Sequence, residues 1–346
     1  MHAYTAPGNP LGKPTVLNRI YIIIGLIAIF VLAGAFVVPR FVQWGDYRGR
    51  MEELATDLLG TPVTIRGDIE FALLPQPHLQ FSDVLVGAPD EPAATVDTVE
   101  ADFALMEFLR DDYRITRLEL QGPVVDFTID ESGLFSSGVA LARDNSTVAL
   151  SAARIVDGTV RLLDRRSSEN FVANGVTGDL RLSGPAGPFT FQGSGTYGES
   201  RYGVRFNSSE VDAQGDTRVS AFLQAQEGGF SLSTEGLLTP GMAPRFDGTL
   251  VYRQAPPAAI AAEDIRGDLV FESKVAASSD RIVLSGYTLR PDETRSGTRL
   301  TGAASIQLGV RPSLRVMMAG AVGSFASLGE VGPRVQRLVA DLLGLE

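Results

Sequence analysis

Apolar and polar residues alternate with a period of two along most of the chain after residue 60. The alternating runs are short, and Gly, Pro, Asp or Asn separates them at intervals of roughly ten to fifteen residues, as in strands joined by turns. Clear examples are Leu118/Leu120, Val125/Phe127/Ile129, Leu180/Leu182, Phe189/Phe191, Val204/Phe206 and Ile282/Leu284. Such strands have one apolar and one polar face. The pattern predicts a mainly β protein with antiparallel pairing.

Two segments change to a helical period of three to four residues. In residues 41–60 the apolar positions are Trp44, Tyr47, Met51, Leu54, Ala55 and Leu58. Gly60 and Pro62 follow as helix-ending residues, so a short amphipathic helix is predicted over 41–60. Residues 331–346 contain the run PRVQRLVADLL and predict a second amphipathic helix at the C-terminal end.

One segment is apolar throughout. Residues Ile20–Val38 run for nineteen positions without a charge, between Arg19 and Arg40. A helix of that length covers roughly 28 Å, close to the hydrocarbon core of a bilayer. We therefore predict a transmembrane helix over 19–40, preceded by a flexible tail at 1–18. A cleaved signal peptide is the alternative, because Ala33–Ala35 mimics a cleavage site. The flanking charges do not fix the orientation.

A short sequence motif recurs along the chain. Residues 65–71 read IRGDIEF, residues 265–271 read IRGDLVF, and residues 176–182 read VTGDLRL. Gly permits unusual backbone angles and Asp bonds its own backbone, so each copy is interpreted as a turn before a strand. Repetition of a β unit is one explanation, and chance similarity of common turns is the other.

Composition excludes several function classes. The chain has 30 basic and 41 acidic residues, a formal charge of -11, which disfavours nucleic-acid binding. It has no cysteine, so disulfides and thiolate metal sites are excluded. The sequence GSGTYG at 193–198 is followed by another alternating run and is interpreted as a β-turn. His78 is the only histidine outside the N-terminal tail. We therefore predict no catalytic, cofactor or metal site, and no enzyme.

The segment at residues 42–89 reads VQWGDYRGRMEELATDLLGTPVTIRGDIEFALLPQPHLQFSDVLVGAP. It resembles the N-terminal region of the AsmA family at Gly60, Val63, Ile65, Gly67, Ile69, Pro75, Pro77, Leu79, Asp83, Val84 and Val86. Residues 115–135 and 153–168 also look like the family, although Glu131–Phe135 departs from its usual ending. The resemblance implies a single-pass inner-membrane protein with a cytoplasmic N-terminus and a periplasmic C-terminal region.

The resemblance also implies a carrier of phospholipid that supports outer-membrane biogenesis, with envelope proteins as partners at its far end. We expect an AsmA-like β unit at 61–145 and a β-groove at 146–330, within one elongated, curved antiparallel sheet. Candidate groove residues are Val125, Phe127, Ile129, Phe189, Phe191, Val204 and Phe206. Two alternatives stay open: a closed β-sandwich instead of a groove, and a non-enzymatic scaffold for outer-membrane proteins instead of a lipid carrier.

Overall fold

The computed structural model describes residues 44–74, 76–104, 114–137, 149–150, 152–183, 187–226, 229–255, 268–292, 299–309 and 311–321. In this part of the chain no helix is long and apolar enough to cross a membrane. The predicted tail at 1–18, the predicted span at 19–40 and the predicted helix at 331–346 all lie outside the described residues.

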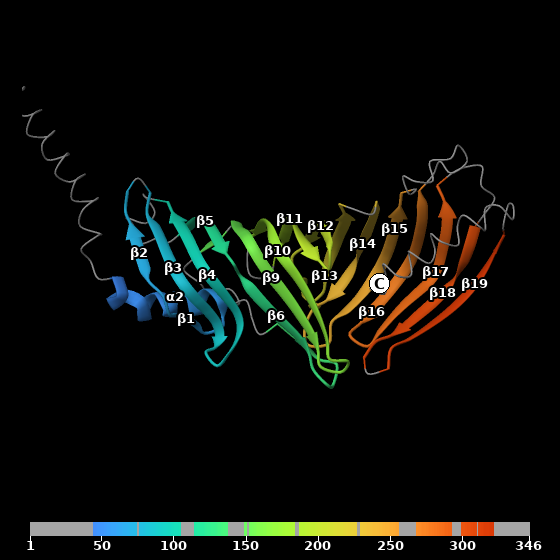
Figure 1. Ribbon diagram of the computed structural model, residues 1–346, viewed down its shortest axis with the longest axis horizontal. Helices are drawn as coiled ribbons and strands as arrows, with labels where there is room; N and C mark the ends of the chain where they lie inside the picture. The colour runs from blue at the N-terminus through green and yellow to red at the C-terminus, as the bar shows by residue number, and fades with distance from the viewer. Residues whose placement is uncertain are drawn as a thin grey trace, which may run out of the picture.

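A short helical segment precedes the strands (Figure 1). It consists of a 3-10 turn, η2 (Trp44–Tyr47), and the helix α2 (Arg48–Leu59). Gly60 ends α2 in the left-handed conformation, with φ 64°, and its N–H donates to the Thr56 carbonyl. Only a residue without a Cβ adopts that conformation without strain. The helix predicted within 41–60, and its end at Gly60, are both found.

The remaining described elements are strands, and they confirm a mainly β protein. They are β1 (Val63–Ile65), β2 (Ile69–Ala72), β3 (His78–Ala88), β4 (Glu91–Phe103), β5 (Arg114–Gln121), β6 (Val124–Ile129), β7 (Phe135–Ser136), β8 (Ala149–Leu150), β9 (Ala152–Asp164), β10 (Glu169–Leu182), β11 (Phe189–Tyr197), β12 (Ser200–Ser208), β13 (Thr217–Ala225), β14 (Phe230–Thr239), β15 (Arg245–Gln254), β16 (Leu269–Ser278), β17 (Arg281–Pro291), β18 (Arg299–Gln307) and β19 (Ser313–Ala321).

All of these strands belong to one long, curved sheet (Figure 1). β1 and β2 both pair with β3, and β3 pairs with β4. β5 and β6 lie between β4 and β9, and from β9 to β19 each strand pairs with the next in an antiparallel meander. The alternative of a β-sandwich is wrong for the described residues, because they contain no second sheet.

The expectation of purely antiparallel pairing is also wrong. β5 and β6 pair with β9 in parallel, through registers such as Leu120↔Ile155 and Phe127↔Leu162. β9 therefore runs in the same direction as β5 and β6. A period of two gives the same side-chain alternation in parallel and antiparallel strands. The sequence pattern therefore could not distinguish the two.

A row of residues with left-handed backbone angles crosses the first half of the sheet. Asp83, Gly122, Asp157 and Gly175, in or beside β3, β5, β9 and β10, all have φ between 50° and 60°. They are neighbours across strands: the Gly122 N–H donates to the Val156 carbonyl at 2.9 Å. Register shifts accompany the row where β10 pairs with β9 and β11, and a shift of one residue reverses the alternation on either side of it. The apolar positions change from even numbers at Leu118 and Leu120 to odd numbers at Val125 and Phe127, and stay on one face.

Side chains of α2 complete the outer edge of β1. The Ile65 N–H donates to the Glu52 carboxylate at 2.7 Å, and the Val63 N–H donates to the Thr56 hydroxyl at 3.0 Å. The Arg48 guanidinium donates to the carbonyls of Ile65 and Gly67. An exposed strand edge is a template for unwanted pairing. At this end of the sheet, the helix occupies that edge.

Replacing Glu52 with alanine is expected to destabilise the protein by about 1–2 kcal/mol, because the partly buried Ile65 amide loses a charged acceptor. Chemical unfolding followed by circular dichroism measures the change. Glu53→Ala is the control, since Glu53 is exposed on the same helix turn. Equal stability of the two variants would contradict a role of Glu52 in protecting the β1 edge.

The recurring Gly-Asp motif does not adopt the same structure at each position. In the first copy, Arg66–Asp68 connects β1 to β2, as interpreted from the sequence. The second copy lies inside β10, where Gly178 pairs with Gly193 and Asp179 pairs with Gln192. The turn interpretation is therefore wrong for residues 176–182. In the third copy the Gly-Asp step begins outside the described residues.

Candidate functional site

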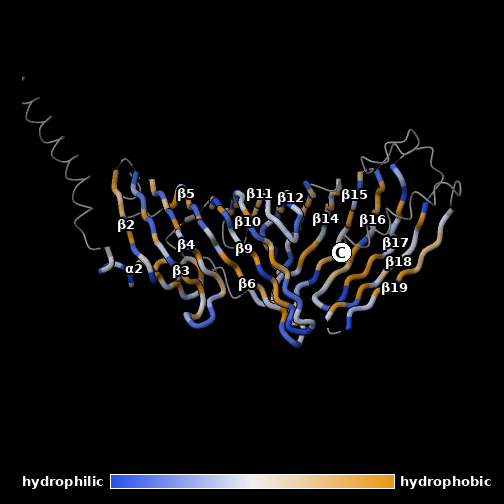
Figure 2. Tube along the Cα trace, in the orientation of Figure 1, coloured by the Kyte–Doolittle hydropathy of each residue, from blue (hydrophilic) through white to orange (hydrophobic). Residues whose placement is uncertain are grey.

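The strand registers place apolar side chains opposite one another across the whole sheet. Phe191 lies opposite Leu180 on one side and Phe206 on the other, and Phe206 lies opposite Ala221. The same face continues through Leu232, Tyr252, Phe271, Leu289 and Leu300. We call it the apolar face. Figure 2 shows hydrophobic and hydrophilic residues alternating along most of the strands, as two distinct faces require.

All seven predicted groove residues lie on the apolar face, and all are partly exposed. Phe189, Phe191, Val204 and Phe206 come together on β11 and β12, where Phe191 pairs with Phe206. The other three, Val125, Phe127 and Ile129, lie on β6, with β9 and β10 between them and β11. The predicted residues therefore form two groups on one surface, and their role in binding stays a prediction.

The apolar face is not equally open along its length. From β15 to β17 it contains a buried cluster built on Tyr252, Leu269, Phe271 and Tyr287. The rings of Phe271 and Tyr287 lie 5.4 Å apart. Burial raises the pKa of the Tyr287 hydroxyl, which donates to the Met317 carbonyl at 3.1 Å. Apolar side chains of this face are therefore partly exposed over β10–β12, whereas packing covers Val219 and Ala225 of β13 and the cluster over β15–β17. The open groove itself stays a prediction.

A ring lies flat on the apolar face at β10 and β11. Gly178 and Gly193 face each other across these strands. A Cβ added at either glycine would lie 2.8 Å from Phe191 Cζ, so the ring occupies the space above both backbones. A Cβ at Gly193 would also lie 2.4 Å from the Thr177 carbonyl oxygen. The two glycines therefore allow the strands and the ring to approach closely.

The same arrangement recurs four strands later. Gly236 of β14 pairs with Gly248 of β15, and a Cβ at either would lie within 2.8 Å of Phe246 Cζ. Both aromatic residues begin a Phe-x-Gly triplet, FQG at 191–193 and FDG at 246–248. This triplet is a signal that the analysis of apolar alternation missed. It places a flat ring, rather than an upright one, on the apolar face.

An ion-pair network joins two distant turns at one end of the strands. The Arg166 guanidinium donates to both oxygens of Asp164, to Asp280 Oδ1 at 2.7 Å and to the Ser279 carbonyl at 2.9 Å. The Arg166 and Asp164 side chains are only 6% and 11% exposed, whereas Asp280 is 63% exposed. Strands β11 to β15 lie between the two turns in the sheet. The network therefore connects two turns across the curved part of the sheet formed by β11 to β15.

The charges in this network stabilise each other. The hydrogen bonds from Arg166 hold the pKa of the Asp164 carboxyl below its usual value, and Asp164 raises the pKa of Arg166 in turn. A second link lies beside it, where the Phe135 N–H donates to the Met242 carbonyl at 2.7 Å. These contacts join the β6–β7, β9–β10, β14–β15 and β16–β17 turns. We call them the turn cluster, and they restrain the curvature of the sheet.

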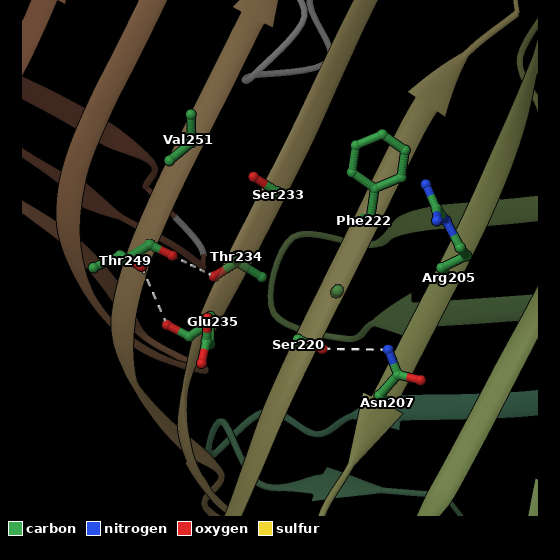
Figure 3. Close-up of a pocket in the computed structure, with 10 residues that line it drawn as sticks. Arg205, Asn207, Ser220, Phe222, Ser233, Thr234, Glu235, Thr249 and Val251 are labelled. Carbon is green, nitrogen blue, oxygen red and sulfur yellow. Dashed lines mark hydrogen bonds between the residues drawn. The ribbon is translucent and has the colours of Figure 1, made fainter.

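The opposite face is polar and carries a shallow pocket of about 400 Å³. Figure 3 shows its lining side chains on β12–β15, among them Arg205, Asn207, Phe222 and Glu235. Arg205 lies over the Phe222 ring, 4.7 Å from its centre. Asn207 donates to the Ser220 hydroxyl at 3.3 Å. This mixed lining suits polar groups and does not provide a continuous hydrocarbon surface.

Titratable side chains do not gather into a metal-binding group in the described ranges. His78 forms one pair there, with its Nδ1 2.7 Å from Asp102 Oδ1, between β3 and β4. The side chains of this pair are 32% and 24% exposed. The pair links neighbouring strands.

Comparison with known proteins gives one match. The model of the AsmA family matches residues 18–156. The matched segment includes the apolar run at 20–38, α2 and the strands from β1 into β9. No curated protein and no solved structure matches the chain.

Proposed function

Because the chain belongs to the AsmA family through residues 18–156, we propose that it is an envelope protein that binds phospholipid on its apolar face and conducts it. In this proposal, residues 19–40 anchor the protein in the inner membrane, the N-terminus is cytoplasmic and the sheet lies in the periplasm. The protein then supports outer-membrane biogenesis by shielding acyl chains from water. Envelope proteins at the far end are the expected partners.

The single observation that carries the proposal is the apolar face, left partly exposed over β10–β12. Each acyl methylene exposed to water costs about 0.8 kcal/mol, so one phospholipid costs some tens of kcal/mol without a protein surface. Strands are about 4.8 Å apart, so the face from β10 to β19 extends on the order of 45 Å. Where this face is open it lowers the barrier for an acyl chain, and it needs no reactive side chain.

The alternative function, a scaffold for outer-membrane proteins, has one observation in its favour. The buried cluster over β15–β17 shows that part of the apolar face packs within the chain. A scaffold, however, would have its whole apolar face covered by its own chain. Four side chains of that face are partly exposed: Phe189, Phe191, Val204 and Phe206. The lipid-binding proposal accounts for both regions if lipid enters where the face is open.

The test is lipid bound to the full chain after mild extraction. Phe191→Asp combined with Phe206→Asp is expected to reduce co-purified phospholipid by roughly tenfold or more, because two charges would meet the acyl chains. Mass spectrometry of the extracted lipid, normalised to protein, provides the measurement. Thr190→Asp combined with Gln192→Asp is the matched control, since both residues are exposed on the polar face of the same strand.

A photo-crosslinking side chain gives a second measurement that does not depend on the stability of charged variants. Placed at Phe206 it is expected to crosslink phospholipid, whereas at the adjacent Asn207 it points to the polar face and is expected not to. Empty wild-type protein in several mild extractions, or equal crosslinking at the two positions, would refute lipid binding on the apolar face and favour the scaffold.

A further inference from the structure

β19 presents the most exposed group of apolar side chains on the described strands. Leu314, Val316, Met317 and Met318 are 44%, 52%, 72% and 61% exposed. Large apolar side chains exposed side by side usually mark an interaction surface. We call Leu314–Met318, together with Arg311, the β19 surface.

Binding of acyl chains to the apolar face does not account for this surface. Leu314, Val316 and Met318 continue the apolar face, since they pair with Ile306, Ala304 and Gly302. Met317 pairs with Ala303 and points to the opposite, polar face, yet it is the most exposed of the group. A partner that covers Met317 must therefore approach the end of the sheet from outside the apolar face.

The two ends of the sheet differ. At the first end, side chains of α2 bond the outer edge of β1. At the other end, β19 pairs with β18 on one side, and within the described residues no strand or helix bonds its outer edge. Tyr287 reaches across β18 and fixes the Met317 carbonyl. β19 is thus held in place and presented at the end of the sheet.

The charge at this end is opposite to that of the whole chain. Residues 299–321 contain Arg299, Arg311 and Arg315 and no acidic residue, although the chain carries a formal charge of -11. The nearest acidic residues in sequence, Glu293 and Glu330, lie outside the described residues. The next acidic residue, Asp292, contacts Arg253 and Arg290. A surface that combines arginine with exposed methionine, leucine and valine is complementary to an anionic lipid bilayer.

We propose that the β19 surface docks on an anionic membrane surface, with its apolar side chains entering the headgroup region and Arg311 and Arg315 contacting lipid phosphates. A second copy of the chain is a poorer occupant. Symmetric pairing of two β19 strands about Val316 would place each Arg315 opposite Met317 and leave the two Arg315 side chains as diagonal neighbours on one face, with no acidic side chain of β19 to pair with them. Each arginine near an anionic surface strengthens binding roughly fivefold.

The absence of cysteine makes a site-specific test direct. In the full chain, Met317→Cys carries an environment-sensitive fluorophore, and Met242→Cys carries it in the control, since Met242 is 65% exposed in the β14–β15 turn. Vesicles of phosphatidylcholine with phosphatidylglycerol are compared with vesicles of phosphatidylcholine alone. We expect a blue shift, and quenching by acyl-chain quenchers, only at position 317 and only with the anionic vesicles.

Charge reversal completes the test. Arg311→Glu combined with Arg315→Glu is expected to weaken the response at position 317 by roughly tenfold or more. Arg201→Glu combined with Arg218→Glu, which alters two exposed arginines on β12 and β13, is expected to leave it unchanged. The neutral pair Arg311→Gln and Arg315→Gln serves if the reversed protein does not fold.

The proposal would be overturned by no shift at position 317, by an equal shift at positions 317 and 242, or by an equal shift with vesicles that lack phosphatidylglycerol. A shift that depends on protein concentration without vesicles would indicate a second copy instead, and would also overturn it. Loss of co-purified lipid in the Phe191 and Phe206 variants is a separate result, so docking and lipid binding on the apolar face can fail independently.

Discussion

Replacing Arg166 with alanine is expected to destabilise the protein by about 3–5 kcal/mol, the range for removing one partner of a buried ion pair. The variant would leave Asp164, 11% exposed, without the guanidinium that bonds both of its oxygens. It would also release Asp280 and the Ser279 carbonyl, so the β9–β10 and β16–β17 turns would lose their direct link. Chemical unfolding gives the free energy, and hydrogen exchange at the two turns locates the effect.

The neighbouring Arg165 provides a matched control. Its guanidinium is 53% exposed and lies 3.6 Å from Glu91, which is itself 88% exposed. An exposed pair of this kind contributes less than about 1 kcal/mol, so Arg165→Ala is expected to change stability little. Arg166→Lys keeps the charge but loses the paired contacts to Asp164, and is expected to fall between the two. Equal free energies of unfolding for Arg166→Ala and Arg165→Ala would show that the turn cluster does not stabilise the curvature of the sheet.

The same network predicts how the free energy of unfolding changes with pH. Arg166 lowers the folded-state pKa of Asp164 below its ordinary value of 3.8. The stabilisation is therefore fully present above that ordinary value and is lost as the pH falls through the lower folded-state pKa. Below pH 3.8, wild-type protein is expected to lose this contribution, whereas Arg166→Ala has none to lose. The difference in stability between the two proteins should narrow as the medium is acidified.

Apolar alternation was sufficient to predict the fold class and the side of the sheet on which each candidate residue lies. It was sufficient because the period of two is a local property of a strand. The row of left-handed positions also has a sequence signal, since the alternation changes between Leu120 and Val125 from even to odd positions. The α2 segment was predictable for a similar reason, because Gly60 marks its end locally.

Other features depend on contacts between distant residues. The parallel pairing of β5 and β6 with β9 joins strands about thirty-five residues apart in sequence, as in Leu120↔Ile155. The Arg166–Asp280 contact joins residues 114 positions apart, and nothing near Arg166 in sequence indicates Asp280 as its partner. The burial of Tyr252 and Phe271 differs from the partial exposure of Phe191, although all three occupy similar alternating runs. Curvature and packing decide that difference.

Replacing Gly193 with alanine is expected to destabilise the protein by about 1–3 kcal/mol, the range for overpacking a well-packed site. The new Cβ would lie 2.4 Å from the Thr177 carbonyl oxygen and 2.8 Å from Phe191 Cζ. The ring could turn upright, but the carbonyl belongs to the backbone of β10, so the two strands would have to separate. Thermal or chemical unfolding, with Phe191 observed by side-chain NMR, would report both effects.

Gly203 on the adjacent strand β12 is the matched control. A Cβ there would meet only the Gln224 carbonyl oxygen, at 4.0 Å, which is ordinary contact. Gly203 has no left-handed backbone angle, so alanine fits its conformation. Gly203→Ala is then expected to be neutral, or stabilising by about 0.4–1 kcal/mol, because it restricts the unfolded chain. If both variants behaved alike, the loss at Gly193 would be a general property of alanine in this sheet. A loss confined to Gly193 would show that a flat Phe191 ring and close strands require the paired glycines.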